Sequence, residues 1–294
     1  MLGVLGDLVQ DVIVWQSEAI RPGTDTRAEI FLQRGGSAAN VAAFAAPRHP
    51  TRFIGCVGDD LGGHVLRRDL EALGVDLRLQ VRGRTGTIVV LVDPGGERSM
   101  FPSRGASAQL ETVEQTWLDG VELLHLTAYS FEPGTTTADA ARAAVAGVRA
   151  RGGRVSFDVS STGLIAHYGR DAFLDLLGSL APDFVSANAD ESRLLGLADG
   201  ALPGPGLGRL PDAVVLARSG ALPTHVFSGG RCVASMPVEP VPDVRDFTGA
   251  GDAFNAGFLA SVLDGGFDPE RNVRAAHGLA RQVLTSPGAS AGAG

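Results

Sequence analysis

Short apolar runs alternate with more polar segments along much of the chain. Between residues 121 and 220, four apolar runs predict strands: VELLHLTAY, RVSFDVS, PDFVSAN and DAVVLAR. The stretches between these runs, such as TADAARAAVAGVRARG, predict helices. Strands that alternate with helices favour a parallel sheet with helices on both faces.

The N-terminal part of the chain has a mixed pattern. LGVLGDLVQDVIVW at residues 2–15 predicts a strand that is interrupted by its Gly-Asp pair. Residues 12–34 and 80–103 are rich in strand and hairpin signals, including a Pro-Gly-Gly turn. We therefore predict one α/β domain over residues 1–294, with a Rossmann-like, mostly parallel central sheet flanked by helices. The segments at about 12–34 and 80–103 are expected to form a small β-sheet lid over an active site.

Charge and composition exclude several classes of protein. The 294 residues carry a net charge of −8 at neutral pH, and a nucleic-acid surface needs clustered positive charge, so we expect no nucleic-acid partner. No apolar run reaches the roughly 18 residues of a membrane-spanning helix, and no signal peptide is evident. We expect a cytoplasmic protein without a membrane partner. All 25 basic residues are arginine, which excludes the lysine-bearing phosphate loop.

The stretch RDFTGAGDAF at residues 245–254 carries candidate chemistry. Glycines at the start of a helix let backbone N–H groups point at an anion, and the helix dipole adds positive potential there. Asp252 at the same point would repel a bound phosphate, but it could accept a proton from a nucleophile that attacks that phosphate. The alternative is that Asp252 only caps the helix. The motif alone leaves both interpretations open.

Four motifs together indicate a family. DFTGAGDAFNAGFLA at the C-terminal end and RGGSAANVAAFAA at residues 34–46 resemble the two signatures of the ribokinase-like sugar kinases, the PfkB carbohydrate kinase family. IGCVGDDLGGHVLRRDLEALGVD at residues 54–76 is similar to the family segment that follows the first signature, and NADE at residues 188–191 resembles its N-x-x-E motif. The motifs come in family order and cover nearly the whole chain. The resemblance implies the ribokinase fold and an ATP-dependent kinase that acts on a hydroxyl group.

The resemblance also assigns roles in phosphoryl transfer. It implies that Asp252 is the general base and that the backbone of Gly249, Ala250 and Gly251 stabilises charge on the transferred group. It places Asp246 near a monovalent-cation site, for which K⁺ is the candidate ion; the alternative is a loop acid that caps a turn.

For the sugar, the resemblance implies that a carboxylate accepts hydrogen bonds from its hydroxyl groups, and Asp11 is preferred to Asp7 for this role. The other sugar-binding candidates are the lid hinge glycines Gly35 and Gly36, together with Asn40 and Arg104. An ordinary surface position is the alternative for Arg104, as it is for Arg34.

For the nucleotide, the resemblance implies that Asn188 and Glu191 organise Mg²⁺, with Glu191 acting through water. The alternative is a surface helix start with Asn188 as its cap. Ala217 and Gly220 are the candidates for phosphate contact. The chain departs from the family at Ala217, where glycine is usual, and Arg218 or Gly220 is expected to compensate.

The sequence therefore predicts a kinase that uses ATP and Mg²⁺ to phosphorylate a small carbohydrate of the ribose, fructose or 2-keto-3-deoxygluconate type. The alternative is a nucleoside kinase of the adenosine or pseudouridine type, which needs aromatic lid residues such as Trp15, Phe31 and Phe101 to stack a base. A binding protein without catalysis would not need Asp252. We further expect a homodimer formed through the lid.

Overall fold

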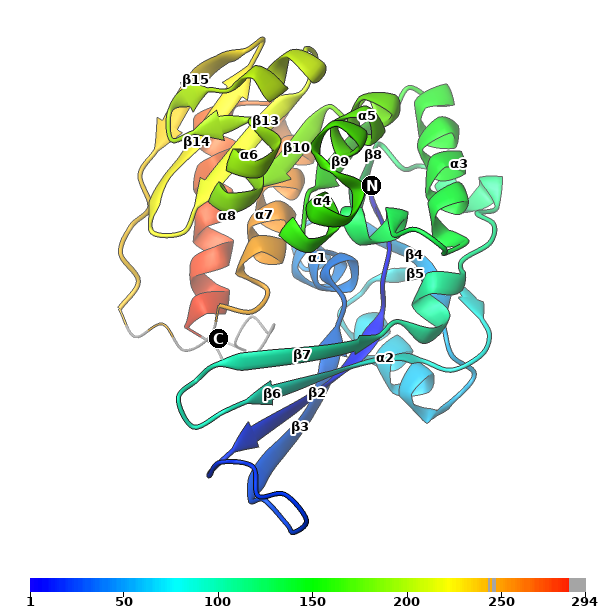
Figure 1. Ribbon diagram of the computed structural model, residues 1–294. Coiled ribbons are helices and arrows are strands. Elements are labelled where there is room, and N and C mark those ends of the chain that lie inside the picture. Colours follow the sequence, from blue (N-terminus) through cyan, green and yellow to red (C-terminus); the bar gives the residue numbers. More distant parts are fainter. Residues whose placement is uncertain (243, 245–246, 286–294) are drawn as a thin grey trace.

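The computed structural model describes residues 1–242, 244 and 247–285, and a nine-stranded sheet lies at its centre (Figure 1). From one edge to the other the strands are β15 (Arg231–Met236), β14 (Leu222–Ser228), β13 (Val214–Ser219), β10 (Phe184–Ala187), β9 (Arg154–Asp158), β8 (Leu123–Thr127), β1 (Leu2–Leu5), β4 (Thr51–Val57) and β5 (Asp76–Val81). The strands from β13 to β5 run parallel, whereas β14 and β15 form an antiparallel hairpin at the edge.

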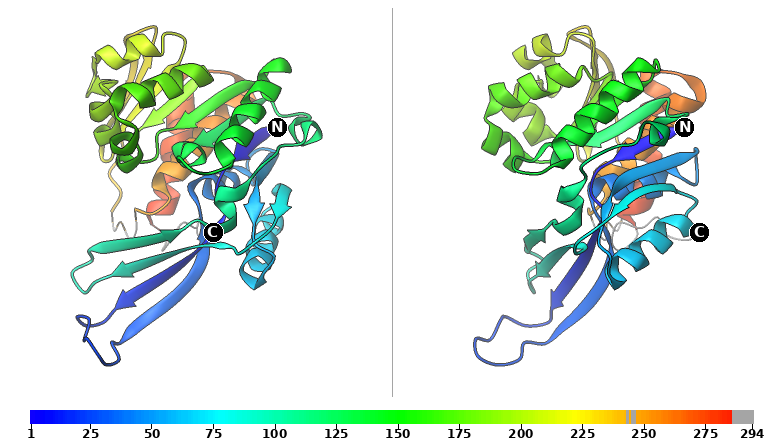
Figure 2. Two further views of the ribbon diagram at one scale, coloured as in Figure 1. Left: turned by 45° about the vertical axis from the view of Figure 1, so that its right-hand side comes forward. Right: turned by 90° about the vertical axis from the view of Figure 1, so that its right-hand side faces the viewer.

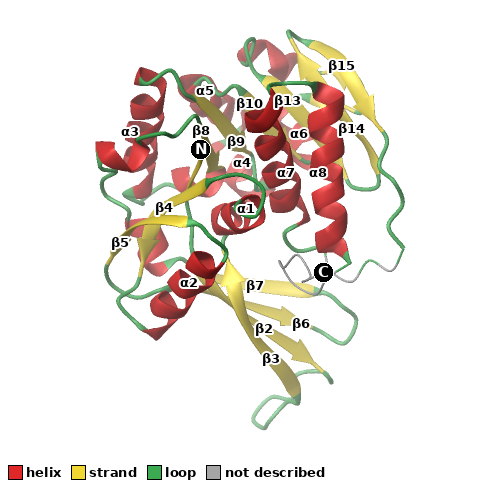
Figure 3. Ribbon diagram, turned by 180° about the vertical axis from the view of Figure 1, so that it is seen from behind, coloured by secondary structure: helices red, strands yellow, loops and turns green. Residues whose placement is uncertain are grey.

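Helices cover both faces of this sheet, as expected for buried parallel strands. Figure 1 shows one face with α3 (Thr137–Ala150), α4 (Thr162–Tyr168), α5 (Arg170–Leu180) and α6 (Ala189–Leu195). Figure 3 shows the other face with α1 (Ser37–Ala45), α7 (Ala250–Gly265) and α8 (Pro269–Leu284). The α2 helix (Leu61–Ala72) contacts β5. Short 3₁₀ helices and a two-residue hairpin complete the fold: η1 Gly105–Gln109, η2 Gln115–Leu118, η3 Ala128–Phe131, η4 Pro205–Arg209, β11 Ala198–Asp199 and β12 Leu202–Pro203.

Apolar side chains of the central strands divide between two cores, one on each face. Phe157 and Val215 pack into the core beneath α3 to α6, whereas Val4 and Leu216 pack into the core beneath α1, α7 and α8. Both cores therefore fix the carboxyl ends of the parallel strands relative to the start of α7. The predicted α/β class and the mostly parallel central sheet are confirmed.

A second, four-stranded sheet stands out from the main body (Figure 2). Its order is β3 (Ala28–Gly35), β2 (Val9–Gln16), β6 (Gly86–Val92) and β7 (Arg98–Ser103). The first predicted strand is thus two strands in two sheets, because the chain turns at Gly6, where a side chain would collide with Ala38. The second lid segment was predicted to begin at about residue 80, but residues 80 and 81 are the end of β5 in the central sheet.

In the described part of the chain, no helix has the length and apolar character needed to cross a bilayer.

Candidate active site

Asp252 lies in the first turn of α7, where the chain leaves Gly249 in the left-handed conformation with φ 79°. The start of α7 carries no side-chain cap, so the capping interpretation of Asp252 is wrong. Its carboxylate instead accepts hydrogen bonds from α1: the Ser37 hydroxyl donates to Oδ1 at 2.6 Å, and the Asn40 amide donates to Oδ2 at 3.0 Å. Two helices that begin at the same end of the sheet thus hold one carboxylate in place.

Burial is the main influence on the acidity of Asp252 and raises its pKa to about 6. The hydrogen bonds from Ser37 and Asn40 oppose this shift, because they stabilise the ionised form. The nearby charge of Asp158 raises the pKa further, and that of Arg218 lowers it. Asp252 is therefore ionised at neutral pH and remains basic enough to accept a proton.

Asp11 on β2 is the second carboxylate of the site. Burial and the charge of Asp252 raise the pKa of Asp11 to about 6, and Arg34 opposes this shift. Its Oδ1 is buried and has no hydrogen-bond partner, so it can accept one from a bound molecule. Gly35 at the end of β3 makes room for it, because a Cβ at that position would overlap with the Asp11 carboxylate.

Asp7, the alternative to Asp11, has its partners within the protein. Arg104 donates from Nε to Asp7 Oδ2 at 2.8 Å and from Nη2 to Oδ1 at 2.5 Å, and its Nη1 donates to Glu132 at 2.5 Å. Each nitrogen of the Arg104 guanidinium thus contacts a carboxylate. Arg104 is not an ordinary surface residue, but its visible role is to fix Asp7 beside the site.

Gly35 and Gly36, the two glycines before α1, lie against different acids of the site. Gly36 is the N-cap residue of α1 with φ 95°, and a side chain there would also overlap with the backbone oxygen of Asp7. Arg34, just before them, forms an ion pair with Asp69 at 2.6 Å, and its charge also acts on Asp11. The chain can thus pass close to Asp7 and Asp11 only with glycine at both positions.

Asn188 and Glu191 form a reciprocal capping box at the start of α6. The Asn188 side-chain oxygen accepts from the backbone N–H of Glu191 at 3.0 Å, and the Glu191 carboxylate accepts from the backbone N–H of Asn188 at 2.8 Å. Asn188 is exposed and caps the helix, as the alternative interpretation expects, whereas Glu191 is only 2% exposed. Burial and the charge of Asp158 raise the pKa of Glu191 to about 7.

Asp158 at the end of β9 was missed in the sequence, and so was its pairing with Arg218 on β13, although Arg218 itself was expected to compensate for Ala217 at the phosphate contact. Asp158 and Arg218 form a buried ion pair, Arg218 Nη2 to Asp158 Oδ1 at 2.9 Å. Asp158 stands at the carboxyl end of a parallel strand, where ligands bind in open α/β sheets, and that position was the available signal. Arg218 lies at an irregularity of the β13–β14 pairing, between Ala217 and Ser219.

The remaining nucleotide candidates lie around the same strand. Ala217 is buried in β13 and pairs with Ala187 of β10. Gly220 follows in the turn to β14 with φ 59° and open space around it. Asp246, the candidate for a monovalent-cation site, lies outside the described residues.

The described residues contain no group of three or more His, Cys, Asp or Glu side chains that could hold a metal ion by themselves. Buried carboxylates are present at Asp158 and Glu191, and Asp158 lies close enough for its charge to raise the pKa of Glu191. This arrangement suits a Mg²⁺ ion that keeps most of its waters and arrives with a nucleotide, since Mg²⁺ is often bound by few protein groups.

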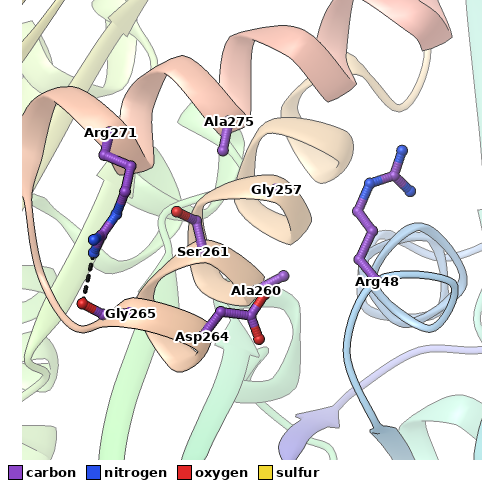
Figure 4. A pocket seen from close by; sticks show the side chains of 8 residues that line it. All are labelled: Arg48, Gly257, Ala260, Ser261, Asp264, Gly265, Arg271 and Ala275. Carbon is purple, nitrogen blue, oxygen red and sulfur yellow. Dashed lines mark hydrogen bonds between the residues drawn. The ribbon is translucent and has the colours of Figure 1, made fainter.

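A separate pocket of about 480 Å³ lies between α7 and α8, toward the far end of α7 from Asp252 (Figure 4). Its polar lining is already engaged, because Arg271 donates to the Gly265 and Gly266 carbonyls and Asp264 pairs with His49 at 2.8 Å. The catalytic candidates therefore do not line this pocket.

The family model described as "pfkB family carbohydrate kinase" matches residues 1–293 of the chain. An ATP-dependent ribose-1-phosphate kinase of Halopiger xanaduensis is 34% identical, covering 85% of this chain and 81% of the relative. A fructokinase of Escherichia coli is 35% identical, covering 97% and 94%.

Among solved structures, the adenosine kinase of Sinorhizobium meliloti superposes with a TM-score of 0.83 at 24% identity, covering 98% of this chain and 94% of that one. A putative ribokinase II of E. coli in complex with ATP and Mg²⁺ gives a TM-score of 0.81 at 24% identity, with the same coverage of 98% and 94%. At these identities the two structures show the fold.

Proposed function

This chain belongs to the pfkB family of carbohydrate kinases, and we propose that it transfers the γ-phosphoryl group of ATP to a hydroxyl of a small carbohydrate of the ribose, fructose or 2-keto-3-deoxygluconate type. One observation carries the proposal. Asp252, a carboxylate with a pKa of about 6, is fixed by two donors at the amino end of a helix and lies within electrostatic reach of Asp11.

In the proposed reaction, Asp252 takes the proton of the attacking hydroxyl. The hydroxyl oxygen forms a bond to the γ-phosphorus while the bond from that phosphorus to the bridging oxygen breaks, and ADP leaves with the electron pair. The backbone N–H groups of Gly249, Ala250 and Gly251 stabilise the charge on the transferred group, because the amino end of a helix favours an anion.

The other site residues bind and orient the two substrates. Asp11 and Asn40 hold sugar hydroxyls, since the buried Asp11 Oδ1 and Asn40 Oδ1 have no partner within the protein. Arg104 supports this end of the site through Asp7. Asn188 and Glu191 act on Mg²⁺ through water, and Ala217 and Gly220 lie beside the nucleotide phosphates. Bound Mg²⁺ neutralises triphosphate charge.

The four-stranded sheet acts as the lid in this proposal. It carries Asp11 on β2, and Gly35 and Gly36 at its junction with α1 provide the hinge. Closing the sheet over the sugar excludes water, which would otherwise accept the phosphoryl group.

A homodimer through this sheet is the proposed assembly. The strand register places Val12, Leu32, Val89 and Phe101 on the face opposite to Asp11. Leu32 and Phe101 are exposed by 64% and 57%, and α2 meets this face at its base, where Asp69 pairs with Arg34. A second copy of the sheet would bury the exposed apolar part of this face.

A nucleoside kinase is the second candidate, and the same register favours it. Trp15 and Phe31 lie on the face that carries Asp11, so both can reach toward a bound base, whereas Phe101 lies on the opposite face. The fold is shared with an adenosine kinase, which is compatible with this reading.

An assay of ADP release tests the proposal. The enzyme would be supplied with ATP and Mg²⁺ and a panel of sugars and nucleosides, with and without K⁺. Turnover on a pentose, a hexose or a keto-deoxy sugar acid supports the proposal. Turnover confined to nucleosides supports the second candidate, and no turnover on any member of the panel contradicts both.

A further inference from the structure

We infer that Arg218 is a catalytic residue that contacts the γ-phosphoryl group, and that Asp158 positions its guanidinium. The inference rests on the proposed kinase function and identifies a side chain that supplies positive charge to the phosphoryl group in a chain without lysine. It also explains why a buried arginine occupies the strand beside the nucleotide.

The guanidinium of Arg218 lies directly against the start of α7. A Cβ built on Gly251 would stand 2.5 Å from Arg218 Nη1, so the guanidinium occupies the space that a side chain at this helix position would need. The Phe254 ring, three residues further along α7, lies 5.7 Å from the guanidinium carbon. Arg218 is thus packed beside the glycines proposed to bind the transferred group.

The position of the guanidinium is fixed by one strong contact. Arg218 Nη2 donates to Asp158 Oδ1 at 2.9 Å, with the two side chains only 14% and 6% exposed. The Ser160 hydroxyl donates to the other oxygen of Asp158 at 3.0 Å, which holds that carboxylate in turn. Asp158 therefore has the geometry of a positioning residue.

Arg218 keeps donors that the protein does not use. Its Nε is buried without a hydrogen-bond partner, and no bond from Nη1 is found among the described residues. A guanidinium has five N–H donors, so after its contact with Asp158 it can still make a two-pronged contact with phosphate oxygens. Leaving buried donors unpaired is costly, and a bound phosphoryl group would satisfy them.

The charge of Arg218 acts on two acids that have separate roles in the proposed transfer. It lowers the pKa of Asp252, the proposed base, and that of Glu191, the proposed Mg²⁺ group. A cation at this point would oppose the negative charge of the triphosphate and of these acids together.

The competing explanation is that Arg218 only neutralises the buried Asp158. The two explanations differ in one double variant, Asp158→Asn with Arg218→Gln. If neutralisation were the only role, removing both charges would restore activity, because no charge would remain unpaired. If Arg218 contacts the phosphoryl group, the double variant stays slow.

The experiment compares wild type, Arg218→Gln, Asp158→Asn and the double variant. Arg142→Gln is the matched control, because Arg142 also lies over a phenylalanine ring, at 5.5 Å from Phe131, but on α3 away from the site. Steady-state kinetics gives kcat and the KM for each substrate. Calorimetry in parallel compares a non-hydrolysable ATP analogue with Mg²⁺ against adenosine.

Arg218→Gln and the double variant are both expected to lose about 100-fold or more in kcat, the usual effect of removing one donor to a transition-state anion. Both should bind the ATP analogue less tightly, with adenosine binding and the KM for sugar changed less than about twofold. Asp158→Asn should fall between these variants and wild type. A double variant with near wild-type kcat, or an Arg218→Gln that matches Arg142→Gln, overturns the inference.

The calorimetry separates this inference from the proposed function. If wild type binds the ATP analogue but turns over no substrate, the proposed function fails, and the loss of analogue affinity in Arg218→Gln still decides the role of Arg218. Equal affinity in both proteins then rejects the inference. If wild type does not bind the analogue at all, both proposals fail.

Discussion

The hydroxyl of Ser37 donates a 2.6 Å hydrogen bond to Asp252, although 215 residues separate them in the chain. The bond joins the first residue of α1 to the first turn of α7, and it ties the glycine-rich start of one helix to the acid of the other. Because it stabilises the ionised carboxylate, it counteracts the effect of burial on the pKa of Asp252.

Replacing Ser37 by alanine should therefore make Asp252 less acidic. We expect the acid limb of kcat/KM, near pH 6 in wild type, to move up by about one unit, since a hydrogen bond to a charged group contributes about 1.5 to 3 kcal/mol. Activity should fall most at pH 6 to 7 and recover at higher pH. Ser179→Ala, on the exposed side of α5, serves as the control; an unmoved acid limb in Ser37→Ala would contradict the prediction.

Gly35→Ala tests the proposed binding of the sugar by Asp11. The new Cβ would overlap with the Asp11 carboxylate, so that side chain must move. We expect the KM for the sugar to rise by about tenfold or more, with the KM for ATP nearly unchanged, because small displacements of a binding group are costly. Gly208→Ala is the matched control, since nothing lies within 4 Å of a Cβ there. A sugar KM that is equal in both variants argues against Asp11 as the group that binds the sugar.

Glu191→Gln tests the burial of a charge at the start of α6. The pKa of Glu191 is raised by burial to about 7 in the folded protein from 4.5 in a model compound. Between these values the unfolded chain releases the proton and the folded chain keeps it, so the glutamate costs stability as pH rises from 5 to 8. Glutamine keeps the capping box without the charge.

The Tm of Glu191→Gln should accordingly exceed that of wild type by several degrees at pH 8 and match it near pH 5. Thermal unfolding in the two buffers, without nucleotide, measures the difference. A constant Tm difference across this pH range would mean that burial does not raise the pKa of Glu191.

Leu32→Glu tests the dimer. Leu32 is 64% exposed on the sheet face opposite to Asp11, and Met100, 61% exposed, lies on the face of Asp11. A glutamate at position 32 should convert the dimer into a monomer in light scattering, because the interface would bury a charge. Met100→Glu is the control and should remain a dimer. A wild-type monomer would exclude this assembly.

The sequence predicted most of the fold because local patterns determine it. Alternating apolar and helical segments predicted the α/β class, and the Pro-Gly-Gly turn marked the hairpin of β6–β7. It failed at the division of residues 2–16 between two sheets, since nothing in that apolar run shows which strand pairs with which.

The site was predictable only where residues sit in motifs. Asp252 and its glycines were found because they are adjacent in the chain. The Asp158–Arg218 pair was not found, because β10 lies between β9 and β13 in the sheet. The contact therefore depends on the strand order and on an irregularity of β13. The partner of Asp7 was hidden for the same reason, since Arg104 lies 97 residues away.

The most direct test of the account is the rate of ADP release by Asp252→Asn with the best substrate of the panel. Asparagine keeps the size of the side chain and its place near Ser37, but it cannot accept the hydroxyl proton. The account predicts that kcat falls by about 100-fold to 10,000-fold while calorimetry shows sugar and ATP-analogue binding retained. A variant that turns over at the wild-type rate would show that Asp252 is not the base and would remove the central element of the proposed mechanism.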